Sequence, residues 1–206
     1  MKALIKKDIF TVLKSMKVFL VIIILFSIIP SFSASSFAVV YAVVYASMLP
    51  LTALAYDERS KWDTLAATMP YSPWQIVGSK YALGYLGLAG SILLTLAAQG
   101  ATRLLGVAFD AASSESVLYA ACTGLMMTAL SLPAAFRLGV EKGRLMLTAL
   151  ILVCILAVVL LSDRLTQVFS ADTSAVSLRI AALIFFTAIN AASIALSAKL
   201  YEKRRH

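Results

Sequence analysis

The chain has 206 residues, of which 61% are hydrophobic and only 14% charged, and its mean hydropathy is +0.92. This composition excludes an ordinary soluble domain and predicts one integral membrane domain over residues 1–206. The net charge of +8 is compatible with nucleic-acid binding, but the basic residues stand in short clusters between apolar runs. Membrane topology explains that pattern better, so we expect no nucleic-acid partner.

Side chains suited to catalysis or metal binding are scarce in this sequence. Cys122 and Cys154 each lie inside an apolar run, where a buried structural thiol is expected rather than a disulfide or a metal ligand. The only histidine is His206, and the sequence has no phosphate-binding loop motif, no HExxH and no Ser/His arrangement. We therefore expect no catalytic residue, no metal site and no cofactor bound by this chain. A membrane enzyme is nearly excluded, and any ATP hydrolysis belongs to another subunit.

Residues 1–17 predict a basic amphipathic helix that lies on the membrane surface before the first span. One face of this helix is apolar and consists of Ile5, Ile9, Val12, Leu13 and Met16. The opposite face is polar and consists of Lys7, Thr11 and Lys14. The alternative is a signal peptide with an apolar region over 18–29 and small residues over 33–35. The basic region is too long, and its apolar face too regular, for that alternative.

Six apolar runs follow, each compared with the roughly 20 residues that a membrane-spanning helix needs. They cover residues 18–32, 37–55, 81–105, 117–136, 145–161 and 180–200. The first is short unless the preceding helix continues into it. Pro50 predicts a kink in the second run, and Pro133 interrupts the fourth. The sequence thus predicts an all-α membrane protein with six transmembrane helices.

The distribution of basic residues predicts the orientation of these spans. With the N-terminus in the cytoplasm, only Arg103, Arg164 and Arg179 of the eighteen Lys and Arg residues lie on the outer side. All the others then lie in the cytoplasm, which is a strong positive-inside signal. We expect a multi-pass protein of the cell membrane with both termini, and the loop 56–80, in the cytoplasm.

The loop 56–80 is the longest polar segment of the chain. Ser60 followed by Asp63 is a weak capping box, which predicts a short helix over 61–68 that Pro70 ends. The apolar residues of this helix fall on one face, namely Trp62, Leu65, Ala66 and Met69. Such a helix suits two roles equally well: lying among lipid headgroups, or docking on a cytoplasmic partner.

A second helix start follows within the same loop. Ser72 is placed as an N-cap, Pro73 occupies the first helical position, and Gln75 stands three residues after the cap. We expect the third span to begin here as a helix, before its apolar part.

A few small and polar residues stand out within the spans. Gly87 and Gly90 form a small-residue pattern that permits close helix approach, within one subunit rather than between subunits. Gln99 and Asn190 are the polar residues expected to face a cavity or another helix, and bridging between helices is the favoured interpretation. The assigned spans have no ionisable residue near their centres, which argues against proton-driven transport and fits an amphipathic or hydrophobic cargo.

Two segments carry a resemblance to a known family: MKALIKKDIF at the N-terminus and DERSKWDTLAATMPYSPWQIVGSKY over 57–81. With these segments and six spans, the chain resembles the permease subunits of type 2 ATP-binding cassette exporters. Within that family it is similar to the small bacterial permeases of phenol-soluble modulin peptide exporters. The second segment is fairly specific to the family, whereas the spans are not.

The resemblance implies a coupling helix around Trp62 that inserts into a separate ATPase subunit, which would bind ATP and Mg²⁺. It also implies an N-terminal elbow helix and a second permease, identical or paralogous, with the path for cargo at the shared interface. The residues that it assigns to ATPase docking are Asp57, Glu58, Arg59, Lys61, Trp62, Asp63, Leu65 and Met69. Residues placed on the path or in helix packing are Gln99, Asn190, Gly87 and Gly90.

Three functions remain open at this point. The chain is expected to export amphipathic peptides or other hydrophobic cargo. A permease for self-protection against antimicrobial peptides would move similar molecules and have the same sequence features. A membrane scaffold that assembles other proteins through the loop 56–80 is the third, and an adjacent gene for an ATP-binding cassette ATPase would argue against it.

Overall fold

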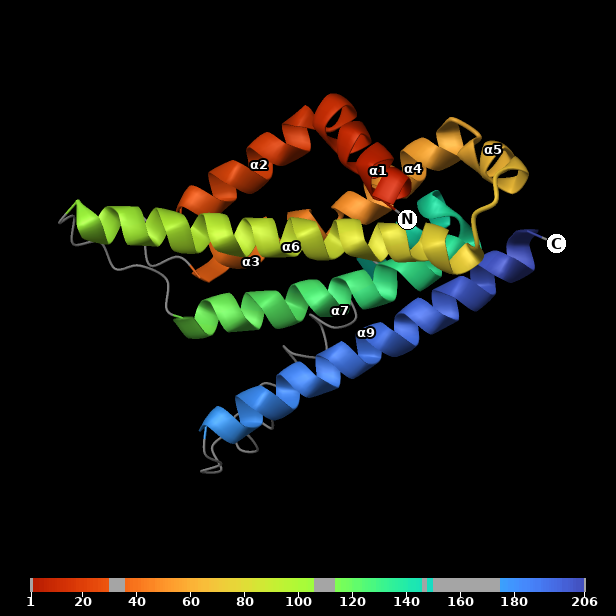
Figure 1. Cartoon of the computed structure of the whole chain (residues 1–206). Coiled ribbons are helices and arrows are strands. Elements are labelled where there is room, and N and C mark those ends of the chain that lie inside the picture. The colour runs from red at the N-terminus through yellow and green to blue at the C-terminus, as the bar shows by residue number, and fades with distance from the viewer. Residues whose placement is uncertain (1, 30–35, 106–113, 146–147, 150–174, 206) are drawn as a thin grey trace.

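The computed structural model describes residues 2–29, 36–105, 114–145, 148–149 and 175–205, and this part of the chain is helical apart from short connections. The helices in chain order are α1 (Lys2–Ser15), α2 (Lys17–Ile28), α3 (Ser36–Ser47), α4 (Leu49–Arg59), α5 (Trp62–Thr68), α6 (Pro73–Leu104), α7 (Ser114–Leu138) and α9 (Ala175–Arg205). Figure 1 shows α6, α7 and α9 running side by side, with α1 and α2 forming a bent pair over α6.

Four helical segments of the described chain are long and apolar enough to cross a membrane. They are Ala38–Arg59, Pro73–Leu104, Val117–Leu138 and Ile184–Lys203, and the bent pair of α1 and α2 would make a fifth. The predicted spans that begin at residues 37, 81, 117 and 180 therefore correspond to helices of the structure. The predicted span over 145–161 lies almost entirely outside the described residues. The structure thus has four to five candidate spans in its described part.

The first predicted span is short in the structure, because the preceding helix does not continue into it. Helix α1 does not continue straight into α2, because the two helices meet at an angle of 85° beside Met16. Helix α2 has 12 residues, which corresponds to a length of about 18 Å at 1.5 Å per residue. That is well short of the roughly 30 Å of a bilayer's hydrocarbon core.

Helix α1 forms where it was predicted, but its buried face is a different one. The buried side chains of α1 are spaced four residues apart, at Leu4, Asp8 and Val12, and Met16 directly after the helix continues the spacing. Ile9 and Leu13, predicted on the same face as Val12 and Met16, are exposed on a side suited to lipid. The physical reason is Asp8, whose carboxylate turns inward to meet two lysines and thereby fixes the rotation of the helix.

The two prolines within predicted spans behave differently from each other. Pro50 lies in the first turn of α4, where no backbone N–H is needed, and it marks the break between α3 and α4 at Met48. The helix is thus interrupted near the predicted position, and Ala38–Arg59 together still form one candidate span. Pro133 lies inside α7, which continues from Ser114 to Leu138, so the predicted interruption of the fourth span is wrong.

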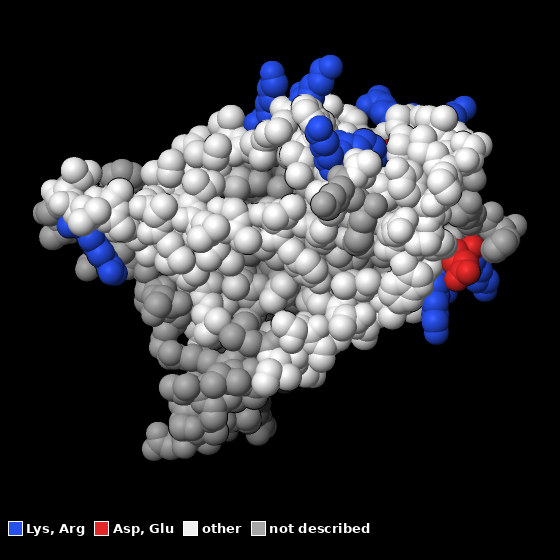
Figure 2. Space-filling model, in the orientation of Figure 1, with Lys and Arg blue, Asp and Glu red and all other residues white. Residues whose placement is uncertain are grey.

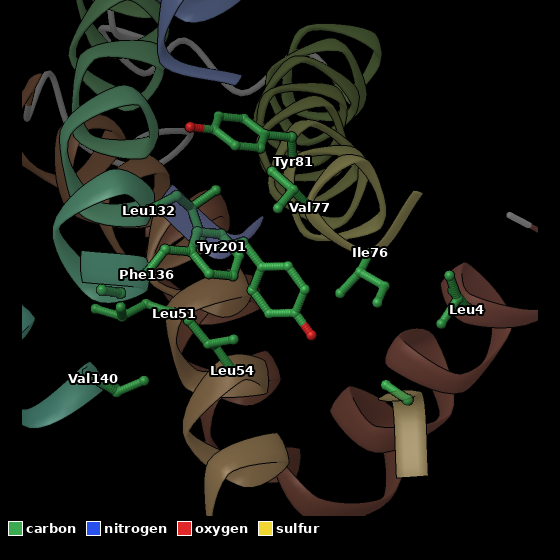
Figure 3. Close-up of a cluster of buried hydrophobic side chains, with 12 residues drawn as sticks. Leu4, Leu51, Leu54, Ile76, Val77, Tyr81, Leu132, Phe136, Val140 and Tyr201 are labelled. Atoms are coloured by element: carbon green, nitrogen blue, oxygen red, sulfur yellow. The ribbon is translucent and has the colours of Figure 1, made fainter. Parts of the chain in front are cut away.

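The buried apolar side chains form two clusters along the bundle. One lies near the start of α6 and includes Val77, Leu132 and Phe136, with the Phe136 ring 5.7 Å from that of Tyr201 (Figure 3). The other lies further along the bundle and joins α2, α3, α6 and α7. The first cluster supports the surface from which α5 projects.

One end of the bundle, here called the loop end, holds α5, the start of α6 and both chain termini (Figure 1). Figure 2 shows Lys and Arg side chains at this end and along the top of the molecule. A broad uncharged surface separates them from a basic group at the opposite end. The uncharged surface is suited to a bilayer, and the loop end to water.

Candidate functional site

The short helix α5 projects from the loop end after a sharp turn of the chain. Helix α4 ends at Arg59, and Lys61 then adopts a left-handed backbone conformation with φ of 53°. The observed helix agrees with the predicted 61–68 to within one residue. Its predicted cap does not, because the N-cap is Lys61 without a side-chain hydrogen bond. The Ser60 hydroxyl instead donates to the carbonyl of Asp57 at 3.2 Å and so belongs to the end of α4.

The second predicted helix start is confirmed in detail. The backbone N–H of Gln75 donates to Ser72 Oγ at 3.3 Å, and that of Ser72 donates to Gln75 Oε1 at 3.4 Å. Pro73 occupies the first turn, and α6 continues from it without a break to Leu104. This capping box fixes where the connection from α5 ends and the long span begins.

The apolar side chains of α5 differ in their exposure to solvent. Ala66 is buried, and Trp62 is half-buried against the cluster of Figure 3. Leu65 is 53% exposed, while Met69 after the helix is half-buried. The side chain of Asp63 lies outside the described part of the chain. Among the described apolar side chains of α5, Leu65 is thus the one available at the surface.

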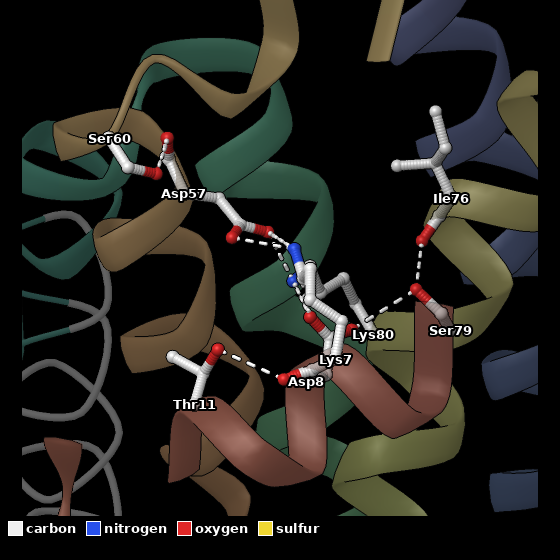
Figure 4. A network of polar contacts seen from close by, with 8 residues as sticks. All are labelled: Lys7, Asp8, Thr11, Asp57, Ser60, Ile76, Ser79 and Lys80. Atoms are coloured by element: carbon white, nitrogen blue, oxygen red, sulfur yellow. Dashed lines mark hydrogen bonds and ion pairs between the residues drawn. The ribbon is translucent and has the colours of Figure 1, made fainter. Parts of the chain in front are cut away.

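Four charged side chains next to α5 are here called the charge cluster: Lys7, Asp8, Asp57 and Lys80 (Figure 4). Lys80 Nζ lies 2.7 Å from Asp8 Oδ1 and 2.5 Å from Asp57 Oδ2. Lys7 Nζ lies 2.7 and 2.9 Å from the two oxygens of Asp57, and 3.2 Å from Asp8 Oδ1. The cluster therefore joins α1, α4 and α6.

The charge cluster is shielded from solvent and balanced in charge. The side chains of Asp8 and Lys80 are only 1% and 2% exposed, and those of Asp57 and Lys7 are 10% and 25% exposed. Ser79 Oγ adds a hydrogen bond to Asp8 Oδ2 at 3.2 Å. Burying charges costs free energy, and only close pairing with full hydrogen bonding offsets it. Each carboxylate here contacts both ammonium groups, so the site meets that requirement.

Lys7 also connects the charge cluster to α5. Its ammonium group lies 4.2 Å from the ring centroid of Trp62, within the range of a cation–π interaction. Sequence reasoning placed Lys7 on the outer polar face of α1 and did not single out Asp8 or Lys80. The available signal was an acidic residue inside a basic amphipathic helix, together with a lysine at the start of an apolar span.

The residues predicted for docking occupy different positions around this cluster. Asp57 lies inside the protein, within the charge cluster, rather than on the outer surface. Glu58 accepts a hydrogen bond from the backbone N–H of Val140 at 3.2 Å. Arg59 and Lys61 are exposed beside α5. Of these four residues, the two basic ones are presented to solvent.

Glu58 holds the segment after α7 against the end of α4. Gly139 directly follows α7 with φ of 83°, a conformation that glycine adopts without strain and that ends the helix. The guanidinium of Arg144 lies 3.5 Å from Thr52 Oγ1 of α4. A cavity of about 680 Å³ opens between the two segments, and Arg59, Glu141 and Lys142 are among its lining residues.

Within the bundle, polar side chains join helices. Asn190 donates to the carbonyls of Leu125 and Phe186 at 3.2 and 2.8 Å, and its Oδ1 accepts from the Tyr85 hydroxyl at 3.1 Å. Gln99 is buried in the last third of α6. Asn190 thus bridges α6, α7 and α9.

The two glycines singled out in the third span have different surroundings. A Cβ at Gly87 would lie 2.9 Å from Leu49 Cδ1 and 3.2 Å from the carbonyl of Ala46, so this glycine permits α6 to approach α3 and α4 closely. A Cβ at Gly90 would have no atom of the described chain within 4 Å. Within the described part of the chain, close helix packing therefore involves Gly87 and not Gly90.

A family model described as ABC-2 family transporter protein matches residues 3–202 of the chain. No curated protein and no solved structure matches it. The family match spans the charge cluster, α5 and the candidate spans together. Permeases of this family lack the ATPase domain, and they generally pair with an ATP-binding subunit. The chain therefore belongs to the ABC-2 transporter family and is a membrane permease component of an ABC-2 type transporter.

Proposed function

We propose that the chain is the permease of an exporter, and that α5 is the helix by which it docks on the ATP-binding subunit. The observation that carries this proposal is the division of α5 into an anchored and a free side. Trp62 and Ala66 hold the helix to the bundle, and Leu65 stands exposed at the loop end. An exposed apolar residue surrounded by charge is the usual composition of a small docking surface.

In this proposal the residues in and around α5 have different roles in docking. Leu65 supplies the apolar contact, and the basic side chains of Arg59 and Lys61 flank it. Trp62 acts from behind as the anchor of the helix, and Asp57 acts through the charge cluster. Met69 and Glu58 support the two sides of the turn.

The mechanism follows from this docking. ATP and Mg²⁺ bind at the partner subunits, whose association displaces α5 in each of two permeases, and the spans respond by opening a path to the outside. Residues 1–206 form one permease domain with six spans and cytoplasmic termini. The concentration of basic side chains at the loop end supports that orientation (Figure 2).

The chemistry of the described spans supports an amphipathic cargo. Apart from the charge cluster at the loop end, the interior polar groups described there are hydroxyls and amides, such as Tyr81, Ser193 and Asn190. Such groups suit a peptide or lipid-like molecule better than an ion. Export of amphipathic peptides and self-protection against them both follow from this chemistry.

The docking role is tested by Leu65→Glu, because Leu65 is exposed and its replacement leaves the core intact. The tagged permease is purified from native membranes in mild detergent, and ATPase activity is measured in the eluate. We expect the wild type to carry an ATPase and the variant to lose most of it. Lys203→Glu serves as the control, since it reverses a charge on an exposed residue at the same end of the molecule.

The outcomes separate the remaining functions. Equal ATPase recovery with Leu65→Glu and wild type would place α5 among lipid headgroups. Absence of ATPase from the wild type would favour the scaffold. Orientation is tested with single cysteines at Ser60 and Arg103 in a chain without Cys122 and Cys154. Labelling of both from the same side would contradict the topology.

A further inference from the structure

We infer that the charge cluster positions α5 for docking, and that Lys7 is the residue through which α1 holds it. On this inference α1, α4 and the start of α6 form one unit, so that a displacement of α5 moves all three. The inference rests on the proposed docking of α5 on an ATPase subunit.

Helix α5 cannot keep its position by its own stability. It has only 7 residues, and isolated helices shorter than about 12 residues are marginal in water. Its N-cap offers no side-chain hydrogen bond, and the chain becomes extended at Met69. The placement of α5 therefore depends on the inward contacts of Trp62 and Ala66.

The contact of Trp62 with Lys7 is the link between α5 and α1. Lys7 Nζ lies 4.2 Å from the Trp62 ring centroid and is held at the same time by both oxygens of Asp57. The ammonium group therefore cannot leave the ring without separating from a carboxylate. Because Asp57 lies on α4, which leads directly into α5, one side chain ties the helix to both of its neighbours.

Lys80 extends the same link to α6. Its ammonium group bridges Asp8 of α1 and Asp57 of α4 in a site that is almost completely buried. Pulling any one of the three helices away would strand a buried charge, which is far more costly than losing an apolar contact of similar size. We therefore expect the three helices to move together.

Two backbone breaks mark where this unit ends. Helices α1 and α2 meet at 85° beside Met16, and α3 and α4 are interrupted at Met48 before Pro50. Of the three helices in this unit, α6 is the one that continues without a break, through 32 residues. A displacement of α5 is thus expected to turn the unit about Met16 and Met48 and to tilt α6 along its whole length.

The test uses Trp62 as its own reporter. The chain has two tryptophans, so Trp74→Phe leaves Trp62 as the single fluorophore. In that background we compare Lys7→Met with Lys7→Arg, because arginine retains both the positive charge and the stacking on an aromatic ring. Lys6→Met is the matched control, an exposed lysine one position earlier on α1. Acrylamide quenching of Trp62 is measured on the purified permease alone, and ATPase recovery is measured from native membranes.

We expect Lys7→Met to raise the quenching constant of Trp62 about twofold, since the ring loses the ammonium group that holds it in place. ATPase recovery should fall by about threefold to tenfold, which matches the loss of one cation–π contact. Lys7→Arg should restore both values, and Lys6→Met should change neither. The pair Lys7→Met with Asp57→Asn removes one charge of each sign and should raise quenching as Lys7→Met does.

The quenching measurement tests the positioning role of Lys7 without requiring the ATPase partner. Unchanged quenching in Lys7→Met or, if that variant does not accumulate, in the double variant would overturn the positioning role, even if ATPase recovery fell. If Lys7→Met raises the quenching but the wild-type permease brings down no ATPase, the placement of α5 is supported and its docking function is refuted. Raised quenching with full ATPase recovery would overturn the claim that this placement serves docking.

Discussion

Helix α6 is attached to its neighbours by different chemistry at its start and in its middle. At the loop end, the charge cluster joins it to α1 and α4 through Lys80. Further along, Gly84 and Gly87 bring its backbone close to Pro50 and Leu49 of α4. On its other side, the hydroxyls of Tyr81, directly after Lys80, and of Tyr85, one turn further along, join it to α9. The first attachment is ionic, and the second consists of close packing with uncharged hydrogen bonds.

The difference follows from the surroundings of the two regions. At the loop end, water and headgroups are near, and a balanced set of charges can be buried there at an acceptable cost. In the middle of a bilayer an incompletely paired charge is far more costly, so small residues and hydroxyls replace it. A buried ionic cluster separates only as a whole, whereas smooth packed surfaces tolerate small shifts. The loop end is therefore expected to move as a unit and the middle to adjust.

The largest effect is expected for Lys80→Met at the ionic attachment. The substitution leaves two buried carboxylates, those of Asp8 and Asp57, with only the partly exposed Lys7 as a counterion. Breaking a buried ionic cluster in this way costs about 3–5 kcal/mol. The free energy of unfolding, measured by denaturant titration in mixed micelles, should fall by that amount. Lys142→Met removes a lysine from an exposed position and should be nearly neutral.

A smaller loss for Lys80→Met, below about 1 kcal/mol, would mean that water reaches the carboxylates. In that case the loop end would be held by apolar packing alone, and the contrast between the two regions would disappear.

An intermediate effect is expected for Gly124→Ala in the middle of the bundle. A Cβ at this position of α7 would lie 2.5 Å from both Leu88 Cδ2 and Val43 Cγ1. Val43 is buried and stiff at χ1, so the helices must separate slightly. Overpacking of this kind costs about 1–3 kcal/mol, measured as for Lys80→Met. Gly90→Ala is the matched control, because its Cβ would meet no atom of the described chain, and it should be neutral or slightly stabilising.

Local signals in the sequence were sufficient for the helices and for several of their ends. The apolar runs, the Ser72 capping box and the break at Pro50 depend on residues close together in the chain, so their physics can be read directly. The rotation of α1 could not be read in this way. It depends on Asp8 meeting Lys80, which lies 72 residues away in the sequence.

The position of the candidate site was predictable from the sequence, but the contacts that build it were not. The polar loop with Trp62 indicated α5, because amphipathicity over 61–68 is a local pattern. Asp57 was predicted as a surface contact, since nothing near it in the sequence shows that two lysines from other helices surround it. Gly124 was not singled out, because its close contacts come from α3 and α6. Long-range partners decide which polar residues are inside.

The smallest effect is expected for Tyr81→Phe, which removes the hydroxyl between α6 and α9. This hydroxyl lies 2.6 Å from Ser193 Oγ and 3.0 Å from Ser197 Oγ, while Ser193 also donates to the carbonyl of Ala129. Because Ser193 keeps that carbonyl, the loss should be only about 0.6 kcal/mol, the average for hydrogen bonds between membrane helices. Tyr119→Phe, at an exposed position of α7, is the control for the chemical change itself. A loss for Tyr81→Phe as large as that for Lys80→Met would show that a hydroxyl attaches α6 to α9 as firmly as charges attach it to α1 and α4. Helix α6 could then tilt only together with α9, and α9 would belong to the unit that moves.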